Sequence, residues 1–194
     1  MRKLSLLILC LTIFVNVGYS QKTIKWLEIT EVETQIEKDG KDAKRVFIDC
    51  YTDWCGWCKK MDKDTFADTT IAKIMNHYFY SVKFDAESKQ PVMFGGKEYK
   101  NQTPAGKRGG AHELASMLLS NRLAYPSYCV LNPDLTIATV LSSYFPPQDF
   151  EPIIVFLGGR YEAQYPVFED FKKVYEKKIK PELMKEIAKK QVKE

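Results

Sequence analysis

Residues 45–60 read RVFIDCYTDWCGWCKK and join an apolar strand to a close pair of cysteines. The first part, Arg45 to Tyr51, is β-branched and aromatic with one polar interruption, Asp49, which is typical of a strand covered on both faces. Asp49 is an anomaly there, because a buried carboxylate is costly unless it is paired. The second part places Cys55 and Cys58 where the strand ends and a helix is predicted to begin.

Cys55 and Cys58 are separated by two residues and can close a small disulfide at this junction. The unpaired N–H groups and partial positive charge at a helix N-terminus stabilise a thiolate at Cys55, relative to a free thiol with a pKa of about 8.5. We therefore expect Cys55 to face solvent and to be the nucleophile. Cys58, one turn into the helix and less exposed, is placed to attack the mixed disulfide and release the reduced substrate.

The first twenty residues have the features of a secretory signal. Residues 1–3, Met-Arg-Lys, form a positively charged start. Residues 4–17 form an apolar stretch that is shorter than the roughly 20 residues a membrane-spanning helix needs. Residues 18–20 are Gly-Tyr-Ser, which places small residues before a cleavage site at Gln21. An uncleaved anchor is the alternative. We expect cleavage, and hence a periplasmic or otherwise exported protein with no membrane span.

Charge and length indicate where function should be sought. The chain has 194 residues, with 29 Lys+Arg and 25 Asp+Glu. Residues 1–20 hold two of the basic residues and no acidic one, so the chain without them has 27 basic and 25 acidic residues and a net charge of +2. A nucleic-acid surface normally shows a strongly basic face, so no nucleic-acid partner is expected. The length suits one domain with a substantial core, and function is to be sought in a local site.

Four cysteines remain after removal of the signal, in a compartment where disulfides can form and persist. A chain this long and this apolar does not need a disulfide scaffold, so the close pair is more consistent with reactivity than with structure. Cys50 and Cys129 lie in hydrophobic strands. They are expected to be inert buried thiols rather than a second redox pair.

The rest of the chain predicts an α/β pattern with a mixed sheet. Thr30 and Glu33 form a capping-box pattern that predicts a first helix ending at Gly40. Asp68 or Thr69 is expected to cap a second helical segment. The other predicted elements are helices or helical segments over residues 58–66, 71–77, 113–120 and 148–157, and strands over 80–85, 128–131 and 136–141, the last two joined by Asn132-Pro133-Asp134.

Two parts lie outside this pattern. Residues 87–110 are interpreted as an insertion with a small hairpin at Gly95-Gly96. Residues 158–194 predict two amphipathic helices that either pack on the body of the domain or form a dimer or partner surface. The expected organisation is a signal peptide over 1–20, an α/β domain over 21–157 and a C-terminal helical extension over 158–194.

Residues 46–60 resemble the active-site strand and helix of the thioredoxin-fold family. The continuation Met61 to Phe66 makes the likeness closest to exported thioredoxin-like proteins and to the C-terminal thioredoxin-like domain of the bacterial transmembrane thiol:disulfide interchange family, which are disulfide reductases. The likeness covers roughly residues 44–156 without the insertion. It implies a thioredoxin fold, with a mixed central sheet flanked by helices, and a thiol-disulfide oxidoreductase activity.

The resemblance also implies roles for further residues. Asp49 takes the place of the family's buried acid, which would accept a proton from Cys58. Lys83 takes the place of the lysine that lies close to this acid in the family. Pro126 stands where the family has a cis-proline facing the dithiol, beside backbone that can pair with an extended substrate. The substrate-binding residues would then be Trp54, Gly56, Trp57, Tyr125 and Pro126.

Departures from the family pattern bear on the direction of electron flow. Trp57 replaces the proline of thioredoxins, and no histidine lies between the cysteines, where strong oxidants and isomerases use one. This absence favours the reducing side, nearer to about −270 mV than to −120 mV. We expect reduction of disulfides in exported proteins, recharged by an upstream membrane thiol donor, with no cofactor beyond the Cys55–Cys58 disulfide.

Two rival interpretations remain open. One is a partner-binding module of the same fold, in which the insertion and the tail carry the main role. The other is a metal-binding CxxC protein, but a tetrahedral zinc site needs two more ligands. The remaining candidate ligands, Cys50, Cys129, His77 and His112, have no recognisable ligand spacing, so no metal is expected. The two histidines are interpreted as surface or capping residues.

Overall fold

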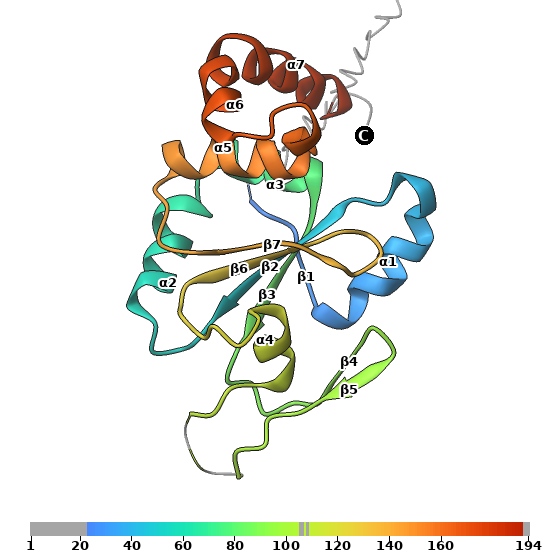
Figure 1. Cartoon of the computed structure of the whole chain (residues 1–194), viewed down its shortest axis with the longest axis vertical. Helices are drawn as coiled ribbons and strands as arrows, with labels where there is room; N and C mark the ends of the chain where they lie inside the picture. The colour runs from blue at the N-terminus through green and yellow to red at the C-terminus, as the bar shows by residue number, and fades with distance from the viewer. Residues whose placement is uncertain (1–22, 105–106, 108, 192–194) are drawn as a thin grey trace, which may run out of the picture.

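The structure is a computed structural model that describes residues 23–104, 107 and 109–191 (Figure 1). The predicted signal peptide lies outside the described residues, as do three positions of the predicted insertion. Among the helices in the described ranges, none is both long enough and apolar enough to cross a membrane.

A five-stranded mixed sheet forms the centre of the fold (Figure 1). Its strand order is β1-β3-β2-β6-β7, with β1, β3 and β2 parallel to one another and β6 antiparallel to both β2 and β7. A separate antiparallel hairpin pairs β4 with β5. The bounds are β1 Trp26–Leu27, β2 Arg45–Tyr51, β3 Phe79–Asp85, β4 Val92–Phe94, β5 Lys97–Tyr99, β6 Ser127–Leu131 and β7 Ile137–Ser142.

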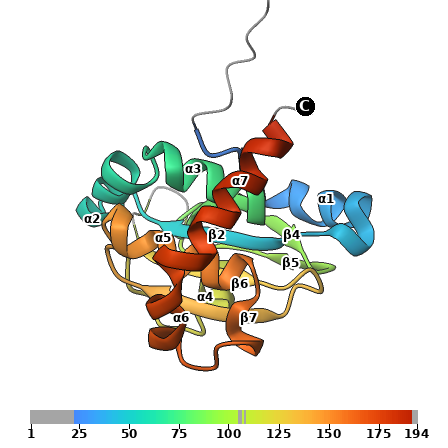
Figure 2. The same cartoon turned by 90° about the horizontal axis from the view of Figure 1, so that it is seen from above.

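Helices cover both faces of the sheet, as the predicted fold class requires (Figures 1 and 2). One face is covered by α2, α3 and α5, and the other by α1 and α4. Helix α2 continues into a π-helical turn over Met61–Thr65. The helix bounds are α1 Val32–Asp39, α2 Gly56–Lys60, α3 Thr69–Tyr78, α4 Glu113–Leu118, α5 Pro147–Gly158, α6 Phe168–Val174 and α7 Lys180–Gln191.

The central strand β2 has the predicted bounds and sends its side chains alternately to the two faces. Phe47 belongs to the core beneath α3 and α5, whereas Ile48 and Cys50 belong to the core beneath α1 and α4. By the same alternation, Asp49 points toward the layer that contains α2 and its π-helical turn. The polar residue of this strand therefore lies on the face that carries the cysteine helix.

The C-terminal helices pack on the body of the domain. Seen from above, α7 crosses the layer that contains α3 and α5 (Figure 2). The Tyr175 hydroxyl donates to the Glu151 carboxylate at 2.7 Å, and the Lys180 ammonium lies 2.7 Å from the same oxygen. The tail was predicted as two helices; a π-helical turn over Tyr175–Ile179 joins α6 to α7 without a break. Its buried side chains extend the core: Phe171, Tyr175, Leu183 and Ile187.

One predicted cap and one predicted turn can be compared with the structure. Asp68 caps α3, because its Oδ1 accepts the N–H groups of Thr70 at 2.8 Å and Ile71 at 3.0 Å. The hairpin at Gly95-Gly96 is present, and both glycines have positive φ, 58° and 71°.

The capping box predicted from Thr30 and Glu33 is wrong. A 3₁₀ turn over Ile29–Glu31 precedes α1, and the carboxylate of Glu31 accepts the N–H of Glu28 at 2.9 Å. Because this turn starts the helical segment at Ile29, the N–H groups that need capping begin before Thr30, and Thr30 cannot be the N-cap.

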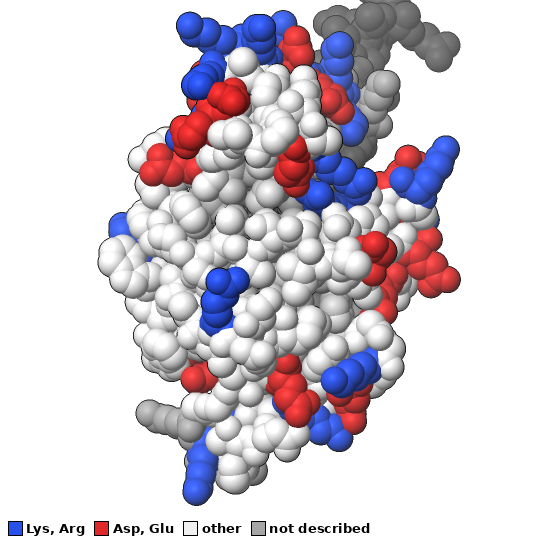
Figure 3. Space-filling model, in the orientation of Figure 1, with Lys and Arg blue, Asp and Glu red and all other residues white. Residues whose placement is uncertain are grey.

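Charged side chains of both signs are interspersed on the face shown in Figure 3, with most of them over the tail helices and along the α1 and β4–β5 edge. The middle of this face is mostly uncharged. No large area of a single sign dominates this view.

Candidate active site

A disulfide joins Cys55 to Cys58 directly after β2, with an S–S distance of 2.03 Å and a Cα–Cα distance of 5.3 Å. Cys55 is the N-cap of α2, and its sulfur accepts the N–H of Cys58 at 3.0 Å. The Cys55 N–H itself donates to the carbonyl of Thr52 at 3.0 Å. The structure therefore places the pair at the strand-to-helix junction, as the sequence predicts, and a helix N–H group already points at the Cys55 sulfur.

One expectation about exposure is wrong. Cys55 was expected to face solvent and to be more exposed than Cys58, but in this disulfide-bonded form each residue is 4% exposed. The reason is the cap geometry: the Cys55 side chain folds back over the first turn of α2 to accept the N–H of Cys58. Trp54 and Trp57, the residues on either side of the Cys55–Gly56 pair in the sequence, are by contrast exposed.

Four aromatic side chains form two ring pairs at the segment that carries the disulfide. Trp54 is 66% exposed and Trp57 is 58% exposed, although both are large apolar residues. The Trp54 ring lies edge-on to Tyr125, with ring centroids 6.0 Å apart. The Trp57 ring contacts Tyr144, from the loop after β7, at 5.4 Å. These four residues are called the aromatic rim below. Tyr144 was missed, because nothing near it in the sequence links it to Trp57.

The insertion reaches this rim. The indole N–H of Trp54 donates to the Glu87 carboxylate at 3.1 Å, and the Asn101 side-chain amide donates to the Glu87 carbonyl at 3.1 Å. Glu87 was not among the predicted site residues, and its position after the end of β3 was the only available signal. The link places the start of the insertion beside the disulfide rather than at a distance from it.

Pro126 directly precedes β6, and the Tyr125–Pro126 peptide bond is cis, as the resemblance implies. The next residue, Ser127, pairs with Cys50 of β2. Pro126 is buried, Tyr125 is half-buried against Trp54, and Gly56 is exposed at the start of α2. All the predicted substrate-binding residues thus belong to the segments at this end of the sheet, and their role in binding stays a prediction.

Asp49 and Lys83 meet beneath the disulfide helix. The Lys83 ammonium lies 3.1 Å from Asp49 Oδ2, and Asp49 is only 1% exposed. The same ammonium bonds the carboxylate of Asp62, in the π-helical turn four residues after Cys58. Asp62 was missed, although helical spacing from Cys58 could have indicated it. The ion pair ties the buried acid on β2 to the helix that carries the redox pair.

Burial sets the pKa of this acid. Removal from water raises the pKa of Asp49 to about 6, and the positive charge of Lys83 offsets part of that effect. For Lys83, burial works toward a lower pKa, but the carboxylates of Asp49 and Asp62 outweigh it and raise the pKa above the ordinary lysine value. A carboxyl group with a pKa near neutrality can accept and release a proton under physiological conditions.

The other cysteines are placed differently. Cys50 and Cys129 are fully buried on the opposite face of the sheet and form no disulfide. Burial raises the pKa of Cys129 to about 12 and that of Cys50 well above the ordinary value. Both thiols are therefore protonated and inaccessible, which agrees with the prediction that they are inert.

The histidines are not part of the redox site. His112 caps α4, because its Nδ1 accepts the N–H of Leu114 at 3.1 Å, but it is buried rather than on the surface. His77, at the end of α3, lies 3.7 Å from Glu186 of α7, and burial lowers its pKa. Among the described residues, no three His, Cys, Asp or Glu side chains are arranged to hold a metal ion.

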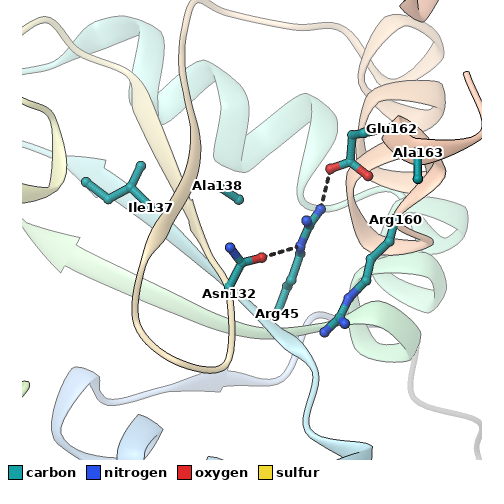
Figure 4. Close-up of a pocket in the computed structure, with 7 residues that line it drawn as sticks. All are labelled: Arg45, Asn132, Ile137, Ala138, Arg160, Glu162 and Ala163. Atoms are coloured by element: carbon teal, nitrogen blue, oxygen red, sulfur yellow. Dashed lines mark hydrogen bonds and ion pairs between the residues drawn. The ribbon is translucent and has the colours of Figure 1, made fainter. Parts of the chain in front are cut away.

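A pocket of about 470 Å³ lies at the opposite end of the sheet (Figure 4). Arg45, the first residue of β2, extends across it between Asn132 and Glu162 (Figure 4). Arg45 also donates to the carbonyl of Leu157 at 2.6 Å. Because six strand residues at about 3.3 Å each separate Arg45 from the other end of β2, this pocket is about 20 Å from the redox end. It is a structural junction between β2 and α5.

Residues 12–186 match the family described as Thioredox_DsbH, protein of unknown function, DUF255. The chain belongs to this family. The match spans most of the chain and includes α6 and the first part of α7, which the resemblance to thioredoxins left out. The Thioredox_DsbH family and the Cys55–Cys58 disulfide together identify a thioredoxin-fold protein related to disulfide oxidoreductases.

Relatives and a solved structure agree with this family. Human spermatogenesis-associated protein 20 is 28% identical over 113 residues, which cover 58% of this chain and 12% of that protein. The thiol:disulfide interchange protein DsbD of Colwellia psychrerythraea is 33% identical over 49 residues, 25% of this chain and 8% of that protein. A thioredoxin from Thermus thermophilus aligns with a TM-score of 0.50 and 16% identity, covering 74% of this chain and 96% of that chain, and shows the fold.

The chain is short beside its relatives. It spans between 8% and 15% of the length of the curated proteins that it matches. The activities of those whole proteins therefore do not identify the activity of this chain.

Proposed function

We propose that this protein is an exported thiol-disulfide oxidoreductase that reduces disulfides in exported proteins. The observation that carries the proposal is the Cys55–Cys58 disulfide at the start of α2, whose first sulfur already accepts a helix N–H group. The same N–H group stabilises a thiolate on Cys55 once the disulfide is reduced. The buried Asp49 beneath the same helix supplies a proton acceptor.

The first step is attack on the substrate. The Cys55 thiolate attacks one sulfur of a substrate disulfide, so that a bond forms between Cys55 and that sulfur while the substrate S–S bond breaks. The other substrate sulfur leaves as a thiolate and takes a proton from solvent. The product is a mixed disulfide between Cys55 and the substrate.

The second step releases the substrate. Cys58 gives its thiol proton to the Asp49 carboxylate, and the resulting thiolate attacks the Cys55 sulfur of the mixed disulfide. The Cys55–Cys58 bond forms and the second substrate thiolate leaves. Two electrons have moved from the dithiol to the substrate, which is reduced, and Asp49 returns its proton to the medium.

The aromatic rim favours protein substrates. Trp54 and Trp57, which are adjacent in sequence to the disulfide segment, expose broad apolar surfaces, and such surfaces bind side chains next to a substrate cysteine. The backbone beside Pro126 is available to pair with an extended segment. A small disulfide such as oxidised glutathione cannot use the whole of this surface, whereas an unfolded protein segment can.

The proposal includes the setting of the reaction. The signal-like segment over residues 1–20 supports export to the periplasm or an equivalent compartment. There the dithiol needs an upstream membrane thiol donor to reduce it after each turnover, and the Cys55–Cys58 pair is the only redox group that the reaction requires. The absence of a histidine between the cysteines supports the reducing direction.

Replacement of the resolving cysteine tests the proposal. The Cys58→Ala variant is mixed with a peptide that contains one intramolecular disulfide, and adducts are measured by intact mass spectrometry. Attack by Cys55 without resolution must leave one peptide attached per protein, whereas the wild-type protein must release reduced peptide. The background Cys50→Ala/Cys129→Ala serves as a control, because an adduct at Cys55 persists when the buried thiols are absent.

A variant that forms no adduct would contradict the proposal. In that case the partner-binding module becomes the better account, and one observation supports it: the insertion is attached to the rim through Trp54 and Glu87. Full cellular activity of a Cys55→Ala/Cys58→Ala variant would favour that rival directly.

A further inference from the structure

Two buried oxygens on neighbouring strands share a face of the sheet and lack a hydrogen-bond partner. Within the described residues four buried side-chain oxygens are unpartnered, and Asp49 Oδ1 and the Tyr128 hydroxyl are two of them. Asp49 of β2 and Tyr128 of β6 are directly opposite in the antiparallel register. Directly paired residues point to the same side of a sheet, so both side chains enter the layer beneath α2.

The Tyr128 ring is fixed by aromatic packing. It stacks on Phe47 with ring centroids 5.4 Å apart and an interplanar angle of 23°, and Phe66 and Phe150 contact its sides at 6.1 Å and 5.9 Å. Tyr128 is completely buried. A phenylalanine would make the same ring contacts, and an unpartnered buried hydroxyl costs free energy, so packing alone does not explain a tyrosine here.

The Asp49 carboxylate has one engaged oxygen and one available oxygen. Lys83 of β3 bonds Oδ2 and is itself held by Asp62 of the π-helical turn. Tyr51, on the same strand, and Tyr128 are the other titratable side chains on this face that interact electrostatically with Asp49. Cys58 lies one helical turn before Asp62, whose carboxylate shares the Lys83 ammonium with Asp49. Oδ1 is therefore the oxygen that can take a proton from Cys58 without displacing Lys83.

One water bound to both atoms would supply the partner that each of these oxygens lacks. The Tyr128 hydroxyl is not within direct hydrogen-bonding distance of Oδ1, yet the two residues face each other across one strand pair. Buried waters occupy such sites when two or more polar groups can bond them. Asp49 Oδ1 and the Tyr128 hydroxyl provide two such groups.

We propose that Tyr128 is a positioning residue for the proton transfer of the Cys58 step, acting through one buried water held between its hydroxyl and Asp49 Oδ1. This inference rests on the proposed function. The Cys58 S–H bond breaks and its proton passes to the water, while the water gives one of its own protons to Oδ1 and forms an O–H bond there. The water is regenerated, no electrons are transferred, and Tyr128 keeps its proton throughout.

The proposal predicts a direction for the titration of Asp49. A water held by Tyr128 donates a hydrogen bond to the carboxylate, and such a bond favours the charged form and lowers the pKa. Removal of the hydroxyl should therefore raise the pKa of Asp49 above its wild-type value of about 6. A hydroxyl with only a packing role would leave this pKa where it is.

The experiment measures the Asp49 carboxyl carbon by NMR across pH in the oxidised protein, for the wild type and Tyr128→Phe. We expect the pKa to rise by about half a unit or more in the variant. Tyr80→Phe is the matched control, because its hydroxyl bonds the Asp39 carboxylate elsewhere in the molecule. That control should not move the titration of Asp49. An unchanged pKa in Tyr128→Phe would overturn the proposal.

A second variant covers the case in which Tyr128→Phe folds poorly. Site-specific 3-fluorotyrosine at position 128 keeps the shape of the ring and makes the hydroxyl a stronger donor, so the pKa of Asp49 should fall. A rise or no change would again contradict the proposal. Because the titration uses the oxidised protein, it is independent of activity: an inactive wild type with the predicted shifts would reject the proposed function and keep the Asp49–Tyr128 link.

Discussion

Arg45 and Asp49 lie on the same strand, four residues apart, and have opposite kinds of surroundings. The Arg45 guanidinium donates to Asn132, to the Leu157 carbonyl and to Glu162, and it lines a pocket in which it is well paired (Figure 4). Asp49 has one oxygen bonded to Lys83 and one without a partner among the described residues. One end of the strand is electrostatically satisfied, and the other is not.

The difference separates structural from chemical roles. A charge with all its hydrogen bonds made contributes to the fold, and its proton has no reason to move. A buried carboxyl with a raised pKa and a free oxygen costs stability but can exchange a proton with a neighbour. We infer that the Arg45 end holds β2 to α5, while the Asp49 end serves the disulfide. The predictions below separate these two roles.

The largest effect is expected at Cys55. Cys55→Ser removes the nucleophile and should lower the rate of disulfide reduction by at least about a thousandfold. The rate is measured with reduced protein and a fluorescent peptide disulfide. Cys129→Ala is the matched control, since that thiol is buried on the other face, and its rate should equal that of the wild type. Equal losses in both variants would show that the two kinds of cysteine are not functionally distinct.

Arg45 should matter for stability and not for exchange. Arg45→Met removes a guanidinium that is 11% exposed, together with its bonds to Glu162, Asn132 and the Leu157 carbonyl. The free energy of unfolding in urea should fall by about 3 kcal/mol. The exchange rate of the folded protein should not change. Arg160→Met, in the same pocket, is the control and should alter the unfolding free energy by less than about 0.5 kcal/mol.

Asp49 should show the reverse pattern. Its pKa is raised in the folded state, so the folded protein binds more protons than the unfolded chain between pH 4 and pH 6, and stability falls as pH rises through this window. The Asp49→Asn variant lacks this fall. At pH 7.5 it should be more stable than the wild type by about 2 to 3 kcal/mol, with little difference at pH 3.5.

The same Asp49→Asn variant should exchange more slowly. Without the proton acceptor, release of substrate from the mixed disulfide should slow by about tenfold to a hundredfold at pH 7. Asp39→Asn, whose carboxylate bonds Tyr80 and Gln35 away from the disulfide, is the control for both measurements. A slow Asp49→Asn variant that is also less stable at pH 7.5 would contradict the separation of roles along β2.

The smallest effect is expected at the aromatic rim. Trp57→Ala and Tyr144→Ala should each raise KM for a protein disulfide about three- to tenfold, with little change in kcat, because they remove apolar contact with the substrate. Reduction of a small disulfide, which cannot contact the rim fully, should be unaffected. A parallel loss with both substrates would mean that the rim acts on the disulfide itself. Steady-state kinetics with the two substrates makes the comparison.

Much of this site could be predicted because it depends on local sequence. The strand over residues 45–51, the cysteine pair after it and the lone acid inside it occupy one continuous segment, so alternation and helix-start rules suffice. The resemblance to thioredoxins then placed Pro126 and Lys83, and the structure shows the cis bond and the ion pair.

The remaining parts depend on distant packing. Tyr144 meets Trp57 across 87 positions, and Tyr128 meets Asp49 only because β6 pairs with β2 in one register. The burial of Cys55 follows from the hydrogen bond that its sulfur accepts from the Cys58 N–H. His112 is buried because its ring packs edge-on against Phe84. Sequence periodicity reports which face of an element is apolar, but it does not report which distant side chain will cover it.

The central claim is that the Cys55–Cys58 disulfide is a working redox couple, and its equilibrium with glutathione tests this claim most directly. The protein is incubated in buffers of defined glutathione potential, quenched with acid, alkylated and analysed by mass spectrometry. We predict one two-electron transition confined to Cys55 and Cys58, with a midpoint nearer to about −270 mV than to −120 mV. A pair that stays oxidised in every buffer until the protein is unfolded, or a midpoint at the oxidant end, would contradict this account.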